Sequence, residues 1–306
     1  MARYNKQTVR GYGKYPLFNF LSTWAKRHQL VLFFGLANTV SWAIWAPLVI
    51  QHPLPTSNLS YLHLAGDAGP MVSALVLTAV VTGKVGTREI VRRMVKWDFG
   101  IMWYLFAILG PLVLFVVSTF IASAFGEPLD LNSLGRTAEF PDAPLAFYYL
   151  GTLLFYGWGE EVGWRGFALP RLQRNRNTLV ATFILSIFWA LWHLPLFWSV
   201  PGYIGLNFLE IIMWYSRILA GSVVVTWLYN STRGSILIAA LFHASVSVAF
   251  KSPQGETTMI ILHILLAIWA LISVIIGGTA DISRAGKYTI SSSGRSSLQD
   301  IKGCDS

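Results

Sequence analysis

Long uncharged apolar runs recur along this chain, and they constrain its fold more than any other feature. A membrane-spanning helix needs about 20 mainly apolar residues. Runs of this kind lie at residues 29–50, 61–83, 100–124, 145–170, 178–200, 210–229, 234–250 and 259–278. Only 12% of the 306 residues are charged and 54% are hydrophobic, which is too little charge to cover a water-soluble domain of this size. The sequence therefore predicts an all-α, polytopic membrane bundle of about eight transmembrane helices.

The basic residues predict which side of the bundle faces the cytoplasm. Of the 23 Lys and Arg residues, all but Arg136, Lys251 and the intramembrane Arg217 fall on one side of the predicted membrane. Cationic segments resist translocation, so this side is expected to be cytoplasmic, and an even number of spans then places both termini there. The net charge of +9 is accordingly interpreted as topology and lipid contact. No nucleic-acid partner is expected.

The two polar ends of the chain define the predicted domain organisation. We expect a polar cytoplasmic N-terminal segment at residues 1–28, one transmembrane domain at 29–278 and a disordered cytoplasmic tail at 279–306. The first 28 residues carry six Lys or Arg and no apolar stretch near the start, so they are not interpreted as a cleaved signal peptide. The single cysteine, Cys304, excludes an internal disulfide.

Ionisable side chains inside the apolar runs are the first candidates for function. A charged group at bilayer depth costs at least ~2.5 to 3.5 kcal/mol, so each one needs a partner or a wet cavity. The set comprises Asp67, Glu160, Glu161, Arg165 and Arg217, with the titratable neutrals His193, His243 and His263. Asp67 and Arg217 are both expected in the outer halves of their spans, where they could pair. His263 is interpreted as a packing residue.

The first cluster is the segment G-W-G-E-E-V-G-W-R-G at residues 157–166. On a helix Glu161 and Arg165 are four residues apart and lie on one face, so they can neutralise each other. Glu160 points about 100° away from them and has no obvious local cation. We expect Glu161 to brace the helix and the partly desolvated Glu160 to accept a proton. The glycines of this segment would allow neighbouring helices to approach closely. A buried ion network without catalysis is the alternative.

Two further clusters centre on histidines. His193 is followed closely by Pro195, which disturbs the helix beside the histidine. His243 and Ser247 are four residues apart and share a helix face. Each histidine alone could be a packing residue. Together with Glu160 they match what water-mediated peptide hydrolysis requires: a base, a proton donor and donors that face the developing oxyanion.

The three motifs, E-E-x-x-x-R, aromatic-x-x-x-His and His-x-x-x-polar on successive apolar runs, resemble those of the CAAX protease and bacteriocin-processing family of intramembrane endopeptidases. That family includes the Ras-converting prenyl-protein proteases. The resemblance covers roughly residues 61–250. Two positions depart from the family pattern, because Trp189 stands where phenylalanine is usual and Ser247 where asparagine is usual. Tryptophan keeps an aromatic ring, whereas serine is a shorter donor than asparagine.

This resemblance implies a helical fold with a conical catalytic cavity, open to the cytoplasm and accessible to a lipidated or membrane-embedded peptide. It implies that Glu160 and His193 activate water and that His243 with Ser247 stabilises the oxyanion, with Glu161 and Arg165 in support. The glutamate mechanism needs no metal. Two histidines and a glutamate could bind zinc, but the sequence has no His-Glu-x-x-His helix. We therefore expect no cofactor, with zinc at Glu160, His193 and His243 as the alternative.

Other functions remain open at this point. A proton-coupled transporter also carries buried carboxylates and histidines, but it usually shows inverted repeats, and none is apparent here. A catalytically weak immunity or scaffold protein could keep the same fold. We expect a glutamate-type membrane endopeptidase in a bacterial plasma membrane, with a membrane-associated peptide and the lipid bilayer as its partners.

Overall fold

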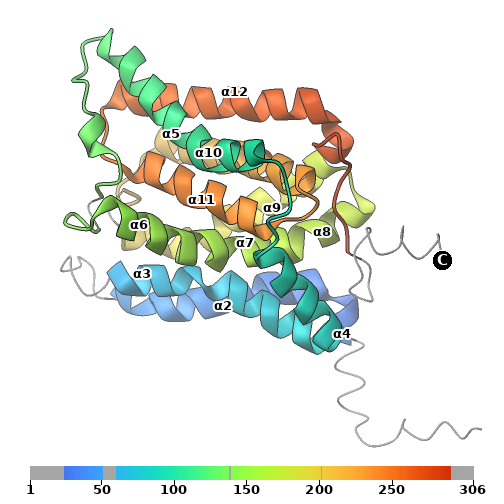
Figure 1. Ribbon diagram of the computed structural model, residues 1–306. Coiled ribbons are helices and arrows are strands. Elements are labelled where there is room, and N and C mark those ends of the chain that lie inside the picture. The colour runs from blue at the N-terminus through green and yellow to red at the C-terminus, as the bar shows by residue number, and fades with distance from the viewer. Residues whose placement is uncertain (1–23, 51–59, 138, 201, 291–306) are drawn as a thin grey trace, which may run out of the picture.

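The computed structural model describes residues 24–50, 60–137, 139–200 and 202–290. Its helices pack side by side, with α12 along one edge of the bundle and α2 to α4 along the opposite edge (Figure 1). Helices α5, α9, α10 and α11 and the α6–α8 run fill the space between these edges. The predicted all-α polytopic bundle is confirmed.

Six helical stretches in the described residues are long and apolar enough to cross a membrane. They are α2 (Gln29–Ile50), α3 with α4 (Ser60–Asp67 and Gly69–Met94), α5 (Ile101–Ser123), α9 with the 3₁₀ turn after it (Thr178–Trp192 and Leu194–Trp198), α10 (Phe208–Ser231) and α12 (Glu256–Asp281). The other two predicted spans are also helical but are short or interrupted. One is α11 (Ile236–Lys251), which has 16 residues, and the other is the run that contains Glu160.

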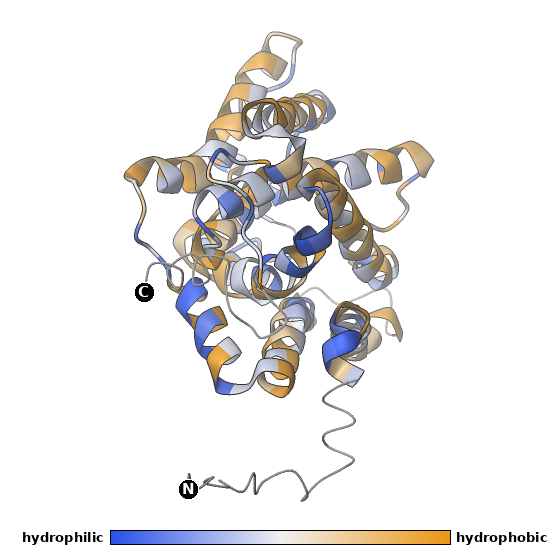
Figure 2. Ribbon diagram, turned by 90° about the vertical axis from the view of Figure 1, so that its right-hand side faces the viewer, coloured by the Kyte–Doolittle hydropathy of each residue, from blue (hydrophilic) through white to orange (hydrophobic). Residues whose placement is uncertain are grey.

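Large apolar side chains face outward on these helices, as lipid contact requires. Phe147 and Ile275 are 73% and 71% exposed, and hydrophobic residues predominate along the helices at the periphery of the bundle (Figure 2). Most of the polar side chains that lie within the helices are instead turned toward the interior, where aromatic rings pack around them. The chain is therefore a multi-pass membrane protein that buries polar side chains within its largely hydrophobic interior.

The run that carries the two glutamates alternates between helix types. It begins with α6 (Leu145–Thr152), and two π-helical turns, Leu153–Trp158 and Trp164–Ala168, flank α7 (Gly159–Gly163) before the run ends in α8 (Leu169–Leu172). Such π-helical turns occur frequently at functional sites. A Cβ atom at Gly159 would lie 2.9 Å from the carbonyl oxygen of Asp67, which confirms the predicted close approach of a neighbouring segment.

The second motif lies where a helix ends. Helix α9 ends at Trp192, and Pro195 lies in the 3₁₀ turn that follows. The backbone N–H of His193 still donates to the carbonyl of Ala190 at 3.1 Å. The predicted disturbance beside His193 is thus a change from α-helix to 3₁₀ helix. His193 itself is the C-cap residue of α9.

The predicted boundary at residue 279 falls inside the bundle. Helix α12 continues to Asp281, and Tyr288 and Ile290 are 3% and 5% exposed. The Tyr288 hydroxyl donates to Glu89 on α4 at 2.9 Å. The predicted tail is therefore packed on the bundle as far as residue 290, because its two large side chains find buried positions. Residues 1–23 and 291–306, which hold the rest of both predicted polar ends, lie outside the described residues.

Candidate active site

A cavity of about 490 Å³ collects side chains from all three predicted clusters. Glu160 from α7, His193 from the end of α9, and His243 and Ser247 from α11 all line it. Glu161 and Arg165 are fully buried behind this lining. The structure thus brings together residues that are separated by up to 87 positions in the chain, as the hydrolytic interpretation requires.

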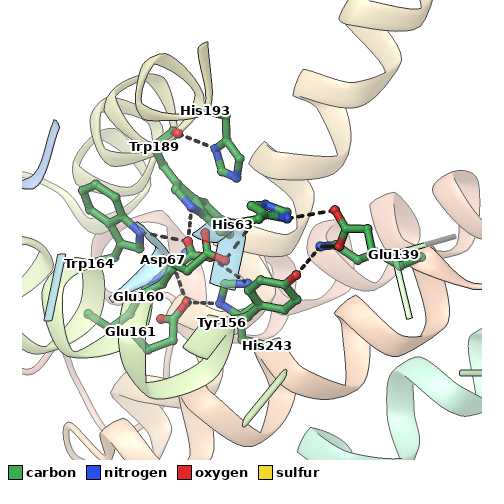
Figure 3. Close-up of polar contacts among 12 residues, drawn as sticks. His63, Asp67, Glu139, Tyr156, Glu160, Glu161, Trp164, Trp189, His193 and His243 are labelled. Carbon is green, nitrogen blue, oxygen red and sulfur yellow. Dashed lines mark hydrogen bonds and ion pairs between the residues drawn. The ribbon is translucent and has the colours of Figure 1, made fainter. Parts of the chain in front are cut away.

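Glu160 is held by two indole rings (Figure 3). Its Oε2 atom accepts hydrogen bonds from Nε1 of Trp189 at 2.6 Å and from Nε1 of Trp164 at 3.1 Å. Its Oε1 atom lies 3.8 Å from Nε2 of His243. Within the described ranges no lysine or arginine forms an ion pair with it, in line with the sequence pattern. The carboxylate is therefore fixed on one side and leaves one oxygen facing the imidazole.

Glu161 supports the site through its contacts to Arg165 and His243. Its Oε1 atom accepts a hydrogen bond from Nη1 of Arg165 at 2.9 Å and a second from Nδ1 of His243 at 2.8 Å. Arg165 also donates to the hydroxyl of Ser222 at 2.8 Å, and its guanidinium lies over the Trp189 ring. The predicted pair of Glu161 and Arg165 is present. The second contact, to His243, fixes the orientation of the imidazole so that Nε2 faces Glu160.

His193 is oriented by the backbone. Its Nδ1 atom lies 2.7 Å from the carbonyl oxygen of Trp189, so Nδ1 is the donor and Nε2 of the neutral ring is an acceptor. In the described part of the chain it has no direct hydrogen bond or ion pair with Glu160. Trp189 connects the two, because its indole holds Glu160 and its carbonyl holds His193. A bound water would have to bridge the two groups.

Ser247 lines the cavity one helical turn beyond His243. Its hydroxyl makes no hydrogen bond to any described residue, so it is available to a ligand.

A family model described as type II CAAX prenyl endopeptidase Rce1-like matches residues 142–249, the part of the chain that supplies Glu160, His193 and His243. This part of the chain is similar to the Rce1-like family. A protein described as CAAX prenyl protease 2, from Methanococcus maripaludis, is 35% identical over 94 residues, which are 28% of this chain and 32% of that relative. The match thus spans about a third of the length of this curated relative. The resemblance inferred from the three motifs is confirmed.

The sequence interpretation missed a polar cluster that reaches the cavity from the other side. Glu139 Oε1 lies 2.8 Å from Nδ1 of His63, and Glu139 Oε2 lies 3.8 Å from Nζ of Lys251. Lys251 also donates to the Tyr156 hydroxyl at 2.8 Å. The one local sign of this cluster in the sequence is the spacing of His63 and Asp67, which are four residues apart. In the structure, Nε2 of His63 lies 4.0 Å from Oδ2 of Asp67. The contacts to Glu139 depend on tertiary packing, so no sequence spacing predicts them.

Glu139 is charged in this cluster. It lies in the loop between α5 and α6, outside the membrane spans. Burial alone would raise the pKa of its carboxyl, but the charges of His63 and Lys251 outweigh burial and lower that pKa to about 2. An ionised carboxylate therefore holds the loop against the helices at neutral pH.

The expected pairing of Asp67 with Arg217 is wrong. Both side chains line the cavity, but the neighbour of Asp67 is His63, and the guanidinium of Arg217 lies over the Phe250 ring at 5.2 Å from its centre. The expectation failed because a shared depth in the membrane does not fix which way a side chain points. Both residues border the cavity, but each contacts a different neighbour.

The alternative zinc site would use Glu160, His193 and His243, which all line the cavity. Among the described residues, no group of three or more His, Cys, Asp or Glu side chains is placed to hold a metal ion. Glu160 and His243 have their contacts to protein groups, and His193 is turned to the Trp189 carbonyl.

The cavity reaches one end of the bundle. Gly202, Ser252, Pro253 and Gln254, from the loops that precede α10 and follow α11, line it. The basic stretches at the end of α4 and around α8 lie at the opposite ends of the helices. Two sequence-based expectations therefore conflict, since the Lys and Arg count places the cavity mouth on the non-cytoplasmic side, whereas the family resemblance implies a cytoplasmic opening.

Proposed function

We propose that this chain is an intramembrane endopeptidase of the glutamate type, which hydrolyses a peptide bond in a membrane-associated or lipidated peptide. The observation that carries the proposal is the convergence of Glu160, His193, His243 and Ser247 on one cavity of about 490 Å³ inside a membrane bundle. The name of the curated relative, a prenyl protease, supports the same reaction class. We place the protein in a bacterial plasma membrane.

The proposed reaction begins with a water molecule between Glu160 and His193. Glu160 accepts one proton of the water as its oxygen attacks the peptide carbonyl carbon, and Nε2 of His193 accepts a hydrogen bond from the other proton. The carbonyl oxygen becomes an oxyanion. When the tetrahedral intermediate collapses, the C–N bond breaks, and the proton held by Glu160 passes to the leaving amine.

The oxyanion would be stabilised from α11. An imidazolium has a donor on each ring nitrogen, and the His243 ring lies between the Glu161 carboxylate at Nδ1 and the Glu160 carboxylate near Nε2. This arrangement suits a ring that keeps Nδ1–H on Glu161 and offers Nε2–H to the substrate. The free Ser247 hydroxyl would supply the second donor, and preorganised donors of this kind usually give the largest single contribution to such catalysis.

The walls of the cavity suit an apolar substrate. Large apolar side chains from four helices line it, namely Ile218, Val246, Phe250, Met259, Leu266 and Trp189. These walls resemble the apolar interior of a bilayer, so a hydrocarbon anchor can pass from the membrane into the cavity without exposure to water. The anchor of a lipid-modified peptide would occupy this apolar part, while the polar groups near Glu160 receive the peptide bond.

A catalytically weak scaffold or immunity protein is the second candidate, because Ser247 reaches less far than the asparagine usual in the family. The experiment that separates the two uses the purified full-length chain in detergent with a fluorogenic farnesylated CAAX-type peptide, with the products identified by mass. We expect cleavage at one peptide bond, unaffected by 1,10-phenanthroline. Uncleaved probe in the presence of folded protein would favour the scaffold role.

A further inference from the structure

Arg217 is a cation in the cavity wall that lacks an anionic partner. It lies on α10, more than two turns from the start of that helix at Phe208, and it lines the cavity. Its guanidinium contacts the face of the Phe250 ring at 5.2 Å. To the residues that the structure describes it makes neither a hydrogen bond nor an ion pair.

The other charged groups of the cavity differ from Arg217 in this respect. Glu139 is held by His63 and Lys251, and Glu160 accepts from two indoles. The second cavity cation, Lys251, has both the Tyr156 hydroxyl and Glu139 close to its ammonium group. Among these charges, Arg217 has no carboxylate partner in the described ranges, and its neighbours are the Phe250 ring and the side chains of Tyr203 and His263.

An unpaired guanidinium within a membrane span is costly unless a ligand or water pairs with it. Its planar fork of N–H donors matches a carboxylate, which it can bind through two parallel hydrogen bonds. The cavity around it is otherwise lined largely by apolar groups and already contains three carboxyl groups, from Asp67, Glu139 and Glu160. Because carboxylates repel an anion and apolar walls do not solvate it, an anionic group is stable in this cavity only beside a cation. Arg217 therefore marks a position at which an anionic group can bind.

The helix that carries Arg217 also contacts the catalytic groups. Trp214, one turn before it, packs against the His193 ring with centroids 5.5 Å apart, and Ser222, just over one turn after it, accepts from Arg165. An anion held by Arg217 is thus in the same chamber as the bond to be broken. A volume of about 490 Å³ is in the range of small-ligand sites, so it can hold a few residues of a peptide.

We propose that Arg217 binds a carboxylate of the peptide substrate, and that this carboxylate is the free C-terminus of a peptide cleaved close to its end. The inference rests on the proposed peptidase function, which it deepens by naming a specificity residue. A chamber of about 490 Å³ favours a chain end over an acidic side chain in the middle of a long segment, because the residues that flank such a side chain would also need room.

The test measures binding, so that it is independent of turnover. The full-length chain carrying Glu160→Gln is purified in detergent and titrated against a fluorescent farnesylated peptide with a free C-terminus, against the same peptide as its C-terminal amide, and against an amide that ends in glutamate. We expect the free acid to bind at least about 10-fold more tightly than the plain amide, since a hydrogen bond to a charged group contributes at this level.

Adding Arg217→Gln should abolish that preference, whereas Arg217→Lys should retain part of it. Arg88→Gln, which removes the same charge from an exposed position on α4, should leave the preference intact. The measured quantity is the ratio of the affinities for the free acid and for the amide. A misfolded variant would bind neither peptide, so it can be told apart from a variant that has lost only the preference. Tight binding of the glutamate-terminated amide would identify a side-chain carboxylate as a second ligand of Arg217.

Equal binding of acid and amide to the parent protein, including no binding of either, would overturn the inference, and so would a preference that survives Arg217→Gln. The proposed function is tested separately by the wild-type chain. If that chain does not cleave the free acid but the acid preference depends on Arg217, the carboxylate site stands and the peptidase assignment fails.

Discussion

The indole of Trp189 changes how the glutamate site works at the level of single residues. From the sequence alone, tryptophan in place of the usual phenylalanine is a conservative change that keeps an aromatic ring. In the structure its Nε1–H donates to Glu160 at 2.6 Å, a hydrogen bond that phenylalanine cannot make. The residue therefore positions the proposed base directly and also carries the carbonyl that orients His193.

Trp189→Phe is predicted to lower kcat by about 10-fold or more while KM changes little, because a hydrogen bond to a charged group contributes ~1.5 to 3 kcal/mol. The measurement is steady-state cleavage of the farnesylated probe. Trp192→Phe is the matched control, since the Nε1 atom of Trp192 is buried without a hydrogen-bond partner in the described residues. Equal kcat for Trp189→Phe and wild type would contradict a role for this hydrogen bond.

The ion pair between Glu161 and Arg165 joins α7 to the π-helical turn after it. The stability of these two elements therefore depends on that pair. Arg165→Met is predicted to lower the yield of folded protein, because breaking a buried pair leaves a buried charge unpaired and costs about 3 to 5 kcal/mol. Arg92→Met removes a cation that is 56% exposed beside Glu89, and it should have little effect. The check is the monodisperse fraction in gel filtration and the Tm in detergent.

A stable and active Arg165→Met protein would show that the pair is dispensable for the fold.

Glu139 is predicted to hold the loop between α5 and α6 against the helices that carry His63 and Lys251. Glu139→Gln should speed tryptic cleavage after the exposed Arg136 at neutral pH, whereas Asp142→Asn, an exposed change in the same loop, should not. The folded-state pKa of Glu139 is lowered to about 2 from its ordinary value of 4.5, so its stabilising contribution is complete above about pH 4.5 and declines as the pH falls toward 2. The ionisation of Glu139 itself should therefore not change the protection of the loop between pH 5 and pH 8.

Faster cleavage of the Asp142→Asn loop than of the Glu139→Gln loop would contradict this account of the clamp.

Local spacing predicted some of these contacts and could not predict others. Glu161 and Arg165 are four residues apart on one helical run, so their pairing follows from helix geometry. The bond between Glu160 and Trp189 joins two separate helical runs, and the contact between His63 and Glu139 joins a helix to a loop 76 positions away. Helical periodicity says which residues are buried, but not how two helices are rotated against each other. For the same reason Asp67 and Arg217 were paired wrongly.

At the scale of the whole molecule, the cavity mouth and the basic residues lie at opposite ends of the bundle. The charge count predicts that the mouth faces away from the cytoplasm. In a Cys304→Ser background, Pro253→Cys at the mouth should react with a membrane-impermeant maleimide in intact cells, and Arg174→Cys at the basic end should react only after permeabilisation. The reverse pattern would establish the cytoplasmic opening that the family resemblance implies.

Glu160 is the group that activates water in the proposed reaction. The most direct measurement compares single-turnover cleavage of the farnesylated probe by the wild type and by Glu160→Gln, with Glu210→Gln as a control that changes an exposed glutamate at the start of α10. We predict that Glu160→Gln folds normally but loses about 10² to 10⁴ in rate, as is typical of a missing general base, while Glu210→Gln cleaves like the wild type. Cleavage by Glu160→Gln at the wild-type rate would contradict the proposed mechanism.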